Sequence, residues 1–289
     1  MDKVLVLGHK NPDTDSICSS IIMEKLAKHL GIDAEAVRLG KLNKETEYVF
    51  NYLGKEPQRE IEKVEDGQKI ILVDHNEAMQ SVDNRENAEV VAVVDHHRIA
   101  DFATVGPLYY IAKPYGCTAT VLFELYKQHG LEVDKETAVL MLSAIISDTL
   151  LLKSPTCTKK DVEAYEELEK LSGLNAAEYG LNMLKAGTDI STLSAEEVIN
   201  LDAKEFAEKG KKITVAQVNT ADINDVFTRK EELTFAMEKA ISEKELDLFI
   251  FVITDIINTN SKIIAIGKDK ELVEKAFDKK LDENDSMIL

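Results

Sequence analysis

The sequence predicts an α/β protein with a mostly parallel N-terminal sheet flanked by helices, followed by a smaller C-terminal α/β domain. Short apolar runs alternate with amphipathic helical patterns through the first half of the chain, the order typical of parallel βαβ units. The runs Ile70–Val73 and Val90–Val94 are apolar at every position, which indicates strands covered on both faces. A chain of 289 residues, 44% hydrophobic and 30% charged, has the size of one large or two ordinary globular domains.

The first predicted domain comprises residues 1–187. Its expected strands are 3–8, 34–39, 69–74, 90–95 and 107–112. Its expected helices are 16–30, 44–53, 117–129, 135–149, 159–171 and 176–186. Asp134 and Thr158 precede two of these helices as N-caps, and Asp161 stands at the N3 position after Thr158.

Glycine and small polar residues predict a linker at 188–193, and the second domain is expected at 194–289. Its expected helices are 194–200, 228–243 and 269–279, and its expected strands are 204–207, 212–218, 247–254 and 262–267. This order of elements predicts a compact α/β unit of about a hundred residues.

Composition narrows the class of function. A net charge of −18 opposes binding to nucleic acid or to anionic membranes. Three cysteines without a CxxC spacing indicate reduced thiols, as in a cytoplasmic protein. The charged N-terminus predicts no signal peptide, and the absence of a run of about 18 apolar residues predicts no transmembrane helix.

Carboxylate and imidazole side chains follow three of the predicted strands and end one predicted helix. Because the carboxyl ends of parallel strands meet at one crevice, we expect these side chains to surround one point. Carboxylate and imidazole side chains suit divalent metal ions. The sequence offers six such side chains, and two ions that share one carboxylate would use all of them. A pair of ions is a common arrangement for attack on phosphorus. The six candidates are His9, Asp13, Asp15, Asp74, His96 and Asp148.

Each candidate ligand can also have an ordinary structural role instead of binding metal. An aspartate at a strand end is more often a turn former or helix cap, and a lone histidine is more often a satisfied surface or core residue. Asp148 alone can be read as the breaker of its helix. Three separate strand ends with the same kind of side chain favour the metal site. His75 follows Asp74 and is expected to point to the other side, so it receives no role.

Several motifs together resemble one family. They are His9-x3-Asp13-x-Asp15 within Gly8–Ser16, the Arg38–Gly40 segment with Asn43, Glu45 and Thr46, Asp95–Arg98, Gly116–Thr120 and Ser147–Leu150. In order and spacing they resemble the manganese-dependent (family II) inorganic pyrophosphatases of the DHH phosphoesterase superfamily. The segments Asp202–Phe206 and Ile213–Val218 resemble the smaller C-terminal domain of that family, the DHHA2 type.

The resemblance implies a hydrolase that splits pyrophosphate into two orthophosphates by a metal-bridging hydroxide. It implies two Mn²⁺ ions per subunit, with Co²⁺ or Mg²⁺ as substitutes, and a homodimer formed through the first domain. Asp74 would bridge the two ions. The first ion would bind His9, Asp13 and Asp74, and the second would bind Asp15, Asp74, His96 and Asp148.

The resemblance also implies two substrate-binding residues, His97 and Lys204. His97 would serve substrate rather than metal, because successive side chains at a strand end are expected to face opposite ways. Lys204 would bind phosphate from the second domain, with the active site between the domains and closed by a hinge. The family ends in a Ser-Arg-Lys motif that is absent before Leu289, so we expect a C-terminal domain without its final segment and poor turnover.

The sequence leaves two alternative functions open. One is another DHH phosphoesterase, acting on polyphosphate, a cyclic dinucleotide or a short oligonucleotide. An aromatic content of 6%, no tryptophan and no glycine-rich nucleic-acid loop disfavour it. The other is a catalytically weak protein that binds metal and phosphate, consistent with the missing motif.

Overall fold

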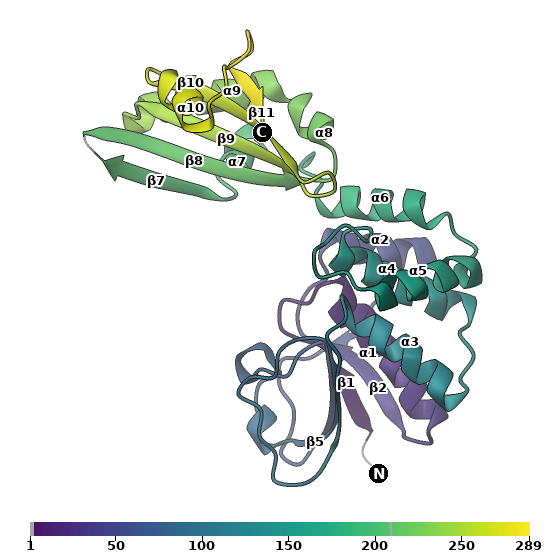
Figure 1. Ribbon diagram of the computed structural model, residues 1–289. Helices are drawn as coiled ribbons and strands as arrows, with labels where there is room; N and C mark the ends of the chain where they lie inside the picture. The colour runs from purple at the N-terminus through teal and green to yellow at the C-terminus, as the bar shows by residue number, and fades with distance from the viewer. Residues whose placement is uncertain (1–2, 209) are drawn as a thin grey trace. The chain divides into compact units, whose positions relative to one another are not determined.

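The computed structural model describes residues 3–208 and 210–289 and forms two compact units, the first ending at Gly187 and the second beginning at Thr188. Figure 1 labels the helices and strands of both. No helix within these described ranges has both the length and the apolar character needed to cross a membrane.

The first unit is built on a six-stranded sheet in which all neighbouring strands are parallel. Its strands are β1 (Val4–Leu7), β2 (Ala34–Arg38), β3 (Arg59–Glu60), β4 (Lys69–Val73), β5 (Glu89–Asp95) and β6 (Tyr109–Ala112). Their spatial order is β3-β2-β1-β4-β5-β6, which confirms the predicted parallel sheet. The chain runs outward in one direction from β1 and in the other from β4. These two strands therefore form a topological switch point, where a crevice opens at the carboxyl ends.

Helices lie on one side of this sheet, some against the strands and the others against those helices. They are α1 (Thr14–His29), α2 (Lys44–Leu53), α3 (Thr118–His129), α4 (Lys135–Thr149), α5 (Lys159–Ser172) and α6 (Ala176–Gly187). Helix α1 packs against β1, β2 and β4, and α3 packs against β5. Helix α4 lies against α1, α3 and α5, which explains why nearly all its side chains are buried. Figure 1 shows these helices gathered together in the first unit.

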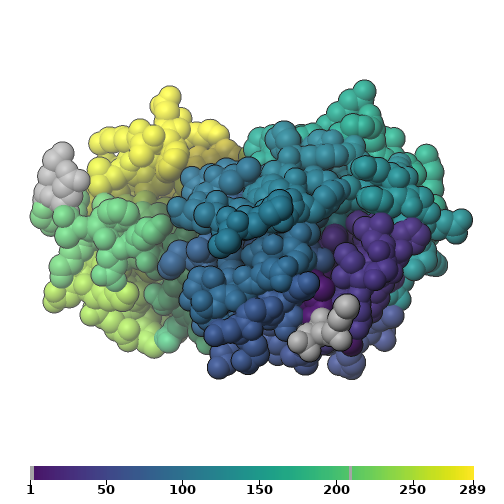
Figure 2. Space-filling view, turned by 90° about the horizontal axis from the view of Figure 1, so that it is seen from below, coloured from purple at the N-terminus to yellow at the C-terminus, as the bar shows by residue number. Residues whose placement is uncertain are grey.

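The other face of the sheet is covered by loops rather than long helices. The side chains of Leu7, Ile70 and Leu72 pack there with Val82 and Phe102 from the loops that follow β4 and β5. Two 3₁₀ turns, η1 (Ala78–Gln80) and η2 (Arg85–Asn87), lie in the connection between β4 and β5. In Figure 2 the segments between about residues 60 and 110, coloured blue, form a continuous surface of the first unit. The strands are thus buried on both faces, as their apolar runs predict.

The structure contains the helix N-caps that the sequence predicts at Asp134 and Thr158. Asp134 accepts a hydrogen bond from the backbone N–H of Thr137 at 2.7 Å, and Thr158 with Asp161 forms a capping box. Helix α1 begins two residues earlier than predicted, at Thr14, because Asp13 is its N-cap and accepts from the N–H of Ser16 at 2.9 Å.

The second unit contains a mixed five-stranded sheet in the order β11-β10-β9-β8-β7. Strands β8 and β9 are parallel, and the other neighbours are antiparallel. The elements are α7 (Ala195–Val198), β7 (Ala203–Glu208), β8 (Lys211–Thr220), α8 (Ile223–Phe227), α9 (Lys230–Lys244), β9 (Leu248–Asp255), β10 (Asn260–Gly267), α10 (Lys270–Phe277) and β11 (Ser286–Ile288).

Two apolar clusters fill the second unit, one on each face of its sheet. Leu233 and Met237 of α9 pack against Phe249 and Phe251 on one face. Val273 of α10 packs with Ile263, Ala265 and Leu248 on the other. This arrangement confirms the predicted smaller α/β domain.

Candidate metal centre

The first group of candidate ligands lies at the carboxyl ends of β1 and β4, at the switch point of the sheet. His9 and Asp13 belong to the loop between β1 and α1, and Asp74 directly follows β4. His9 Nε2 lies 3.5 Å from Asp13 Oδ2 and 3.4 Å from Asp74 Oδ2. One ligand atom from each of the three residues lies within 4.8 Å of the others.

The second group contains Asp15, Asp74, His96 and Asp148, with ligand atoms that also lie within 4.8 Å of one another. His96 directly follows β5, and Asp148 is in the last turn of α4. His96 Nε2 lies 3.4 Å from Asp74 Oδ1 and 3.6 Å from Asp148 Oδ2. The structure therefore brings together all six side chains that the sequence singles out.

Asp74 belongs to both groups. Its Oδ2 faces His9 and its Oδ1 faces His96, so each carboxylate oxygen serves a different group. Asp74 has a φ of +61°, a left-handed conformation that turns the chain directly after the strand. Its backbone N–H donates to the carbonyl of Val94 at 3.0 Å, and its Oδ1 accepts from Thr118 Oγ1 at 3.0 Å. The side chain is 1% exposed and is held on three sides.

Left-handed backbone recurs around the site. Asn11, between His9 and Asp13, has a φ of +52°. Leu150, Leu151 and Leu152, which follow α4 directly, have φ values of +48°, +54° and +64°. Non-glycine residues in this region cost about 1–3 kcal/mol each and tend to cluster at functional sites, where the surrounding structure holds them.

Asp15 is fixed by the N-terminus of α3. Its Oδ2 accepts from the backbone N–H of Thr118 at 2.7 Å, and its Oδ1 accepts from the N–H of Ala119 at 3.2 Å and from Ser19 Oγ at 2.7 Å. Backbone N–H groups at a helix start favour a negative charge, so α3 holds this carboxylate in place.

Asp161 holds the start of α3 in turn. It accepts from the N–H of Gly116 at 2.8 Å and from Thr120 Oγ1 at 2.6 Å. A Cβ atom at position 116 would lie 2.8 Å from Asp161 Oδ2 and 2.9 Å from Thr149 Cγ2, which explains the glycine. The sequence predicts Asp161 only as a helix cap, because its contacts with Gly116 and Thr120 join segments far apart in the chain.

The carboxylates of the centre repel one another. Burial, followed by the charge of Asp74, raises the pKa of Asp15 to about 7. Burial, followed by the charges of Asp15 and Asp74, raises the pKa of Asp148 well above its usual range. Asp74 differs, because hydrogen bonds with His9 and His96 outweigh its burial and lower its pKa. Excess negative charge of this kind attracts a cation.

The nearby carboxylates also raise the pKa values of the two histidines, His9 and His96. Burial opposes the imidazolium form of His9, but hydrogen bonds with Asp13 and Asp74 outweigh it and raise the pKa of His9 to about 11. Burial likewise opposes protonation of His96, and Asp74 with Asp15 raises its pKa to about 9. Protons therefore compete with a metal ion for both rings.

The donor set fits divalent metal ions. His9 Nδ1 lies 2.9 Å from the carbonyl of Lys10, and His96 Nδ1 lies 3.0 Å from the carbonyl of Tyr115. Each Nδ1–H can donate to its carbonyl, which leaves the Nε2 lone pair directed at the carboxylates. Carboxylate oxygens with imidazole nitrogens suit Mn²⁺, Mg²⁺, Co²⁺ and Zn²⁺.

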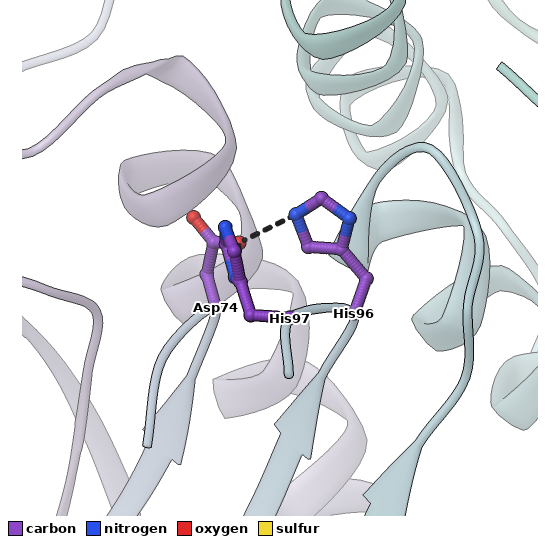
Figure 3. A group of neighbouring side chains, drawn as sticks. All are labelled: Asp74, His96 and His97. Carbon is purple, nitrogen blue, oxygen red and sulfur yellow. Dashed lines mark ion pairs between the residues drawn. The ribbon is translucent and has the colours of Figure 1, made fainter. Parts of the chain in front are cut away.

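His97 faces the same carboxylate as His96. Figure 3 shows Asp74, His96 and His97 at neighbouring strand ends. His97 Nδ1 lies 3.7 Å from Asp74 Oδ1, and the two histidine rings are 4.2 Å apart between centroids. The predicted opposite orientation is wrong, because β5 ends at Asp95 and the alternation of a strand does not continue beyond it. With Asp74 and His96, His97 forms a third group of ligand atoms within 4.8 Å.

His75 and Lys204 are the other two residues that the sequence singles out. His75 is buried, and its ring nitrogens lie 2.9 Å from the carbonyl of Val73 and 3.1 Å from Ser81 Oγ. Burial lowers its pKa to about 4, so the ring is neutral. Lys204 belongs to β7 of the second unit, where its side chain is 71% exposed and its Nζ lies 3.5 Å from Asp202 Oδ1.

Two family models and several curated proteins match this chain. Residues 3–145 match the family model described as "DHH family, N-terminal domain", and residues 181–288 match the "DHHA2 domain". The chain is 52% identical to the "Manganese-dependent inorganic pyrophosphatase" of Bacillus subtilis strain 168, across all of this chain and 94% of that protein. It is 53% identical, with the same coverage, to the "Probable manganese-dependent inorganic pyrophosphatase" of Bacillus licheniformis.

Solved structures show the same relationship. The chain resembles the "Methanococcus jannaschii putative family II inorganic pyrophosphatase" with a TM-score of 0.65 and 41% identity, over 98% of this chain and 92% of that one. An "exopolyphosphatase-related protein from Bacteroides Fragilis" shares the fold, with a TM-score of 0.52 and 14% identity over 95% of this chain and 83% of that one.

Proposed function

The chain belongs to the manganese-dependent inorganic pyrophosphatase family, and on that premise we propose that it hydrolyses pyrophosphate to two orthophosphates. One observation supports this function above the others. Asp74 is shared by two groups of metal ligands, with one carboxylate oxygen facing His9 and the other facing His96. Two ions sharing one carboxylate suit attack on a phosphorus atom.

Two Mn²⁺ ions are proposed per subunit, with Co²⁺ or Mg²⁺ as substitutes. The first would be held by His9, Asp13 and Asp74, and the second by Asp15, Asp74, His96 and Asp148. When bound, the ions would polarise water and offset the negative charge of pyrophosphate. The hydrogen bonds from α3 to Asp15 and from Thr118 to Asp74 fix these carboxylates, which would hold the ions.

His97 is proposed to bind the substrate. Its Nδ1 is engaged by Asp95 Oδ1 at 3.0 Å, so its Nε2 is the ring nitrogen left to hydrogen-bond a phosphate oxygen. The ring is 52% exposed, which permits this contact, and the hydrogen bond with Asp95 raises its pKa. A protonated ring would stabilise the charge that develops on the departing phosphate.

Lys204 is proposed as a second phosphate-binding residue. It is an exposed cation in a chain of net charge −18, and an anionic substrate would need local positive charge of this kind. The proposed organisation has a catalytic domain at 1–187, a linker at 188–193 and a substrate-binding domain at 194–289.

A homodimer formed through the first domain is also proposed. Strand β6 is at the edge of its sheet, and Tyr109 on this strand and Ile99 and Val105 before it are exposed. A cytoplasmic location is proposed because Cys18, Cys117 and Cys157 are free thiols. Light scattering after size exclusion tests the dimer, and a monomer at micromolar concentration would contradict it.

Phosphate release tests the function. The protein is incubated with Mn²⁺ and with pyrophosphate, a long polyphosphate or a cyclic dinucleotide, and the products are quantified. We expect Mn²⁺-dependent release from pyrophosphate and little reaction with the other two. Faster reaction with polyphosphate or the dinucleotide would favour another DHH phosphoesterase. Binding of two ions without release would favour a catalytically weak form.

A further inference from the structure

Glu45 is a carboxylate beside the centre that has no part in the proposed function. It lies in the first turn of α2, and its Oε1 accepts a hydrogen bond from Thr14 Oγ1 at 2.8 Å and another from Ser147 Oγ. Thr14 stands between Asp13 and Asp15 at the start of α1, and Ser147 precedes Asp148 in the last turn of α4. One oxygen atom thus joins the two helix ends that carry these ligands.

The position of Glu45 is itself fixed. Asn43 caps α2 by accepting from the N–H of Thr46 at 2.8 Å, which sets the direction of the first helical turn. The other side of the carboxylate faces Gly187, the last residue of α6. A Cβ atom at position 187 would lie 3.1 Å from both Glu45 Cβ and Glu45 Oε2. Residues from α1, α4 and α6 therefore lie around the side chain, which is half-buried.

A carboxylate is an unfavourable choice for this place on charge alone. Burial raises the pKa of Glu45 despite the hydrogen bonds from Ser147 and Thr14, and the nearby charge of Asp13 adds to the effect. A fifth acidic group next to four ligand carboxylates brings only repulsion unless its geometry is needed. Glu45 accepts hydrogen bonds from the hydroxyl groups of Thr14 and Ser147, and these two bonds are the geometry that the carboxylate supplies.

We propose that Glu45 is a positioning residue that fixes the spacing between Asp15 and Asp148 and thereby sets the affinity of the second metal ion. This inference rests on the proposed function only in assigning these two aspartates to that ion. Asp13 of the first group is held separately by the hydrogen bond from the N–H of Ser16 at 2.9 Å, so the effect is expected at the second group, which includes Asp15 and Asp148.

Three substitutions separate position from charge. Glu45→Gln retains the length and an oxygen that accepts from both hydroxyls but removes the charge. Glu45→Asp retains the charge but is too short to reach both. Glu45→Ala removes both properties. Glu47→Ala, an exposed glutamate in the same helical turn, is the matched control.

The readout is Mn²⁺ binding to the full chain, measured by equilibrium dialysis, with electron paramagnetic resonance to distinguish a coupled pair of ions from a single ion. We expect Glu45→Gln and Glu47→Ala to bind two ions as the wild type does. We expect Glu45→Asp and Glu45→Ala to weaken the second ion by about 10–100-fold, while the first ion binds normally and gives the spectrum of isolated Mn²⁺.

The opposite pattern would overturn the inference. If Glu45→Asp behaves as the wild type and Glu45→Gln loses the second ion, the residue acts through its charge. Equal weakening of both ions, or no change in any variant, would also exclude the role. Circular dichroism checks folding, and if Glu45→Ala does not fold, the comparison of Gln with Asp decides. Binding is measured without substrate, so a wild type that binds two ions but releases no phosphate would contradict only the proposed function.

Discussion

Asp95 Oδ1 accepts two hydrogen bonds from His97, one from its backbone N–H and one from its ring Nδ1, each at 3.0 Å. Asp95 is completely buried, and its Oδ2 accepts from Asn76 Nδ2 at 2.7 Å. Asn76 also donates to the carbonyl of Arg98 at 2.8 Å, so the segment after β5 is held at both ends. The ring of His97 is therefore oriented before any ligand arrives.

The first prediction follows from this orientation. His97→Ala should lower kcat for pyrophosphate by about 100-fold or more, because the substrate loses a positioned proton donor. The affinity for Mn²⁺ should stay near the wild-type value, since the proposed ligand sets do not include His97. Steady-state kinetics and metal titration check this. A large loss of metal affinity in a folded variant would show that His97 is a ligand, as its 3.7 Å distance from Asp74 permits.

A second prediction concerns Asp74. Asp74→Asn should lose both metal ions together, because each oxygen of the carboxylate faces a different group. His9→Ala should mainly weaken the first ion, since His9 belongs only to the first group. Elemental analysis of the two variants after dialysis against Mn²⁺ gives the stoichiometry. Two tightly bound ions in Asp74→Asn would exclude the bridging role.

A third prediction concerns pH. Although burial opposes it, carboxylate partners raise the pKa values of His9 and His96 to about 11 and about 9, so both rings are imidazolium cations at pH 7. A protonated imidazole cannot bind a metal through Nε2, and Mn²⁺ must displace that proton. Affinity should therefore fall as pH is lowered. Calorimetry in buffers of different ionisation enthalpy should show protons released on binding, and a buffer-independent heat would contradict the prediction.

The fourth prediction tests the cap of α4, the helix that carries Asp148. Asp134→Ala removes the oxygen that accepts from the N–H of Thr137 and should lower the free energy of unfolding by about 1 kcal/mol. Asp134→Asn keeps an acceptor at this position and should stay close to the wild type. Urea unfolding of the metal-free proteins measures both. Equal losses in the two variants would show that charge matters more here than the cap.

The sequence predicts most of the metal centre because the topology of a parallel sheet determines where strand ends meet. His9, Asp74 and His96 each follow an apolar strand, and such strands bring their carboxyl ends to one edge. Asp148 is predicted less directly, since it ends a helix whose packing against α1 and α3 is visible only in the fold.

Other parts of the site depend on contacts that no local pattern encodes. Glu45 and Asp161 act on residues far from them in the chain, so the sequence places Glu45 in a family motif and Asp161 in a helix cap without revealing these contacts. The alternation of a strand predicts that His97 faces away, but β5 ends at Asp95 and the alternation stops there. Strands β3 and β11 were missed because they have two and three residues and take their shape from a neighbouring strand.

The participation of α4 has a consequence for how the protein is made. The second group of ligands begins with Asp15 near the N-terminus and is completed only by Asp148. A nascent chain cannot present this group until residue 148 has left the ribosome and α4 has packed against α1 and α3. An ion bound by this second group would therefore stabilise only a nearly finished first unit, whereas the first group of His9, Asp13 and Asp74 is complete much earlier in the chain.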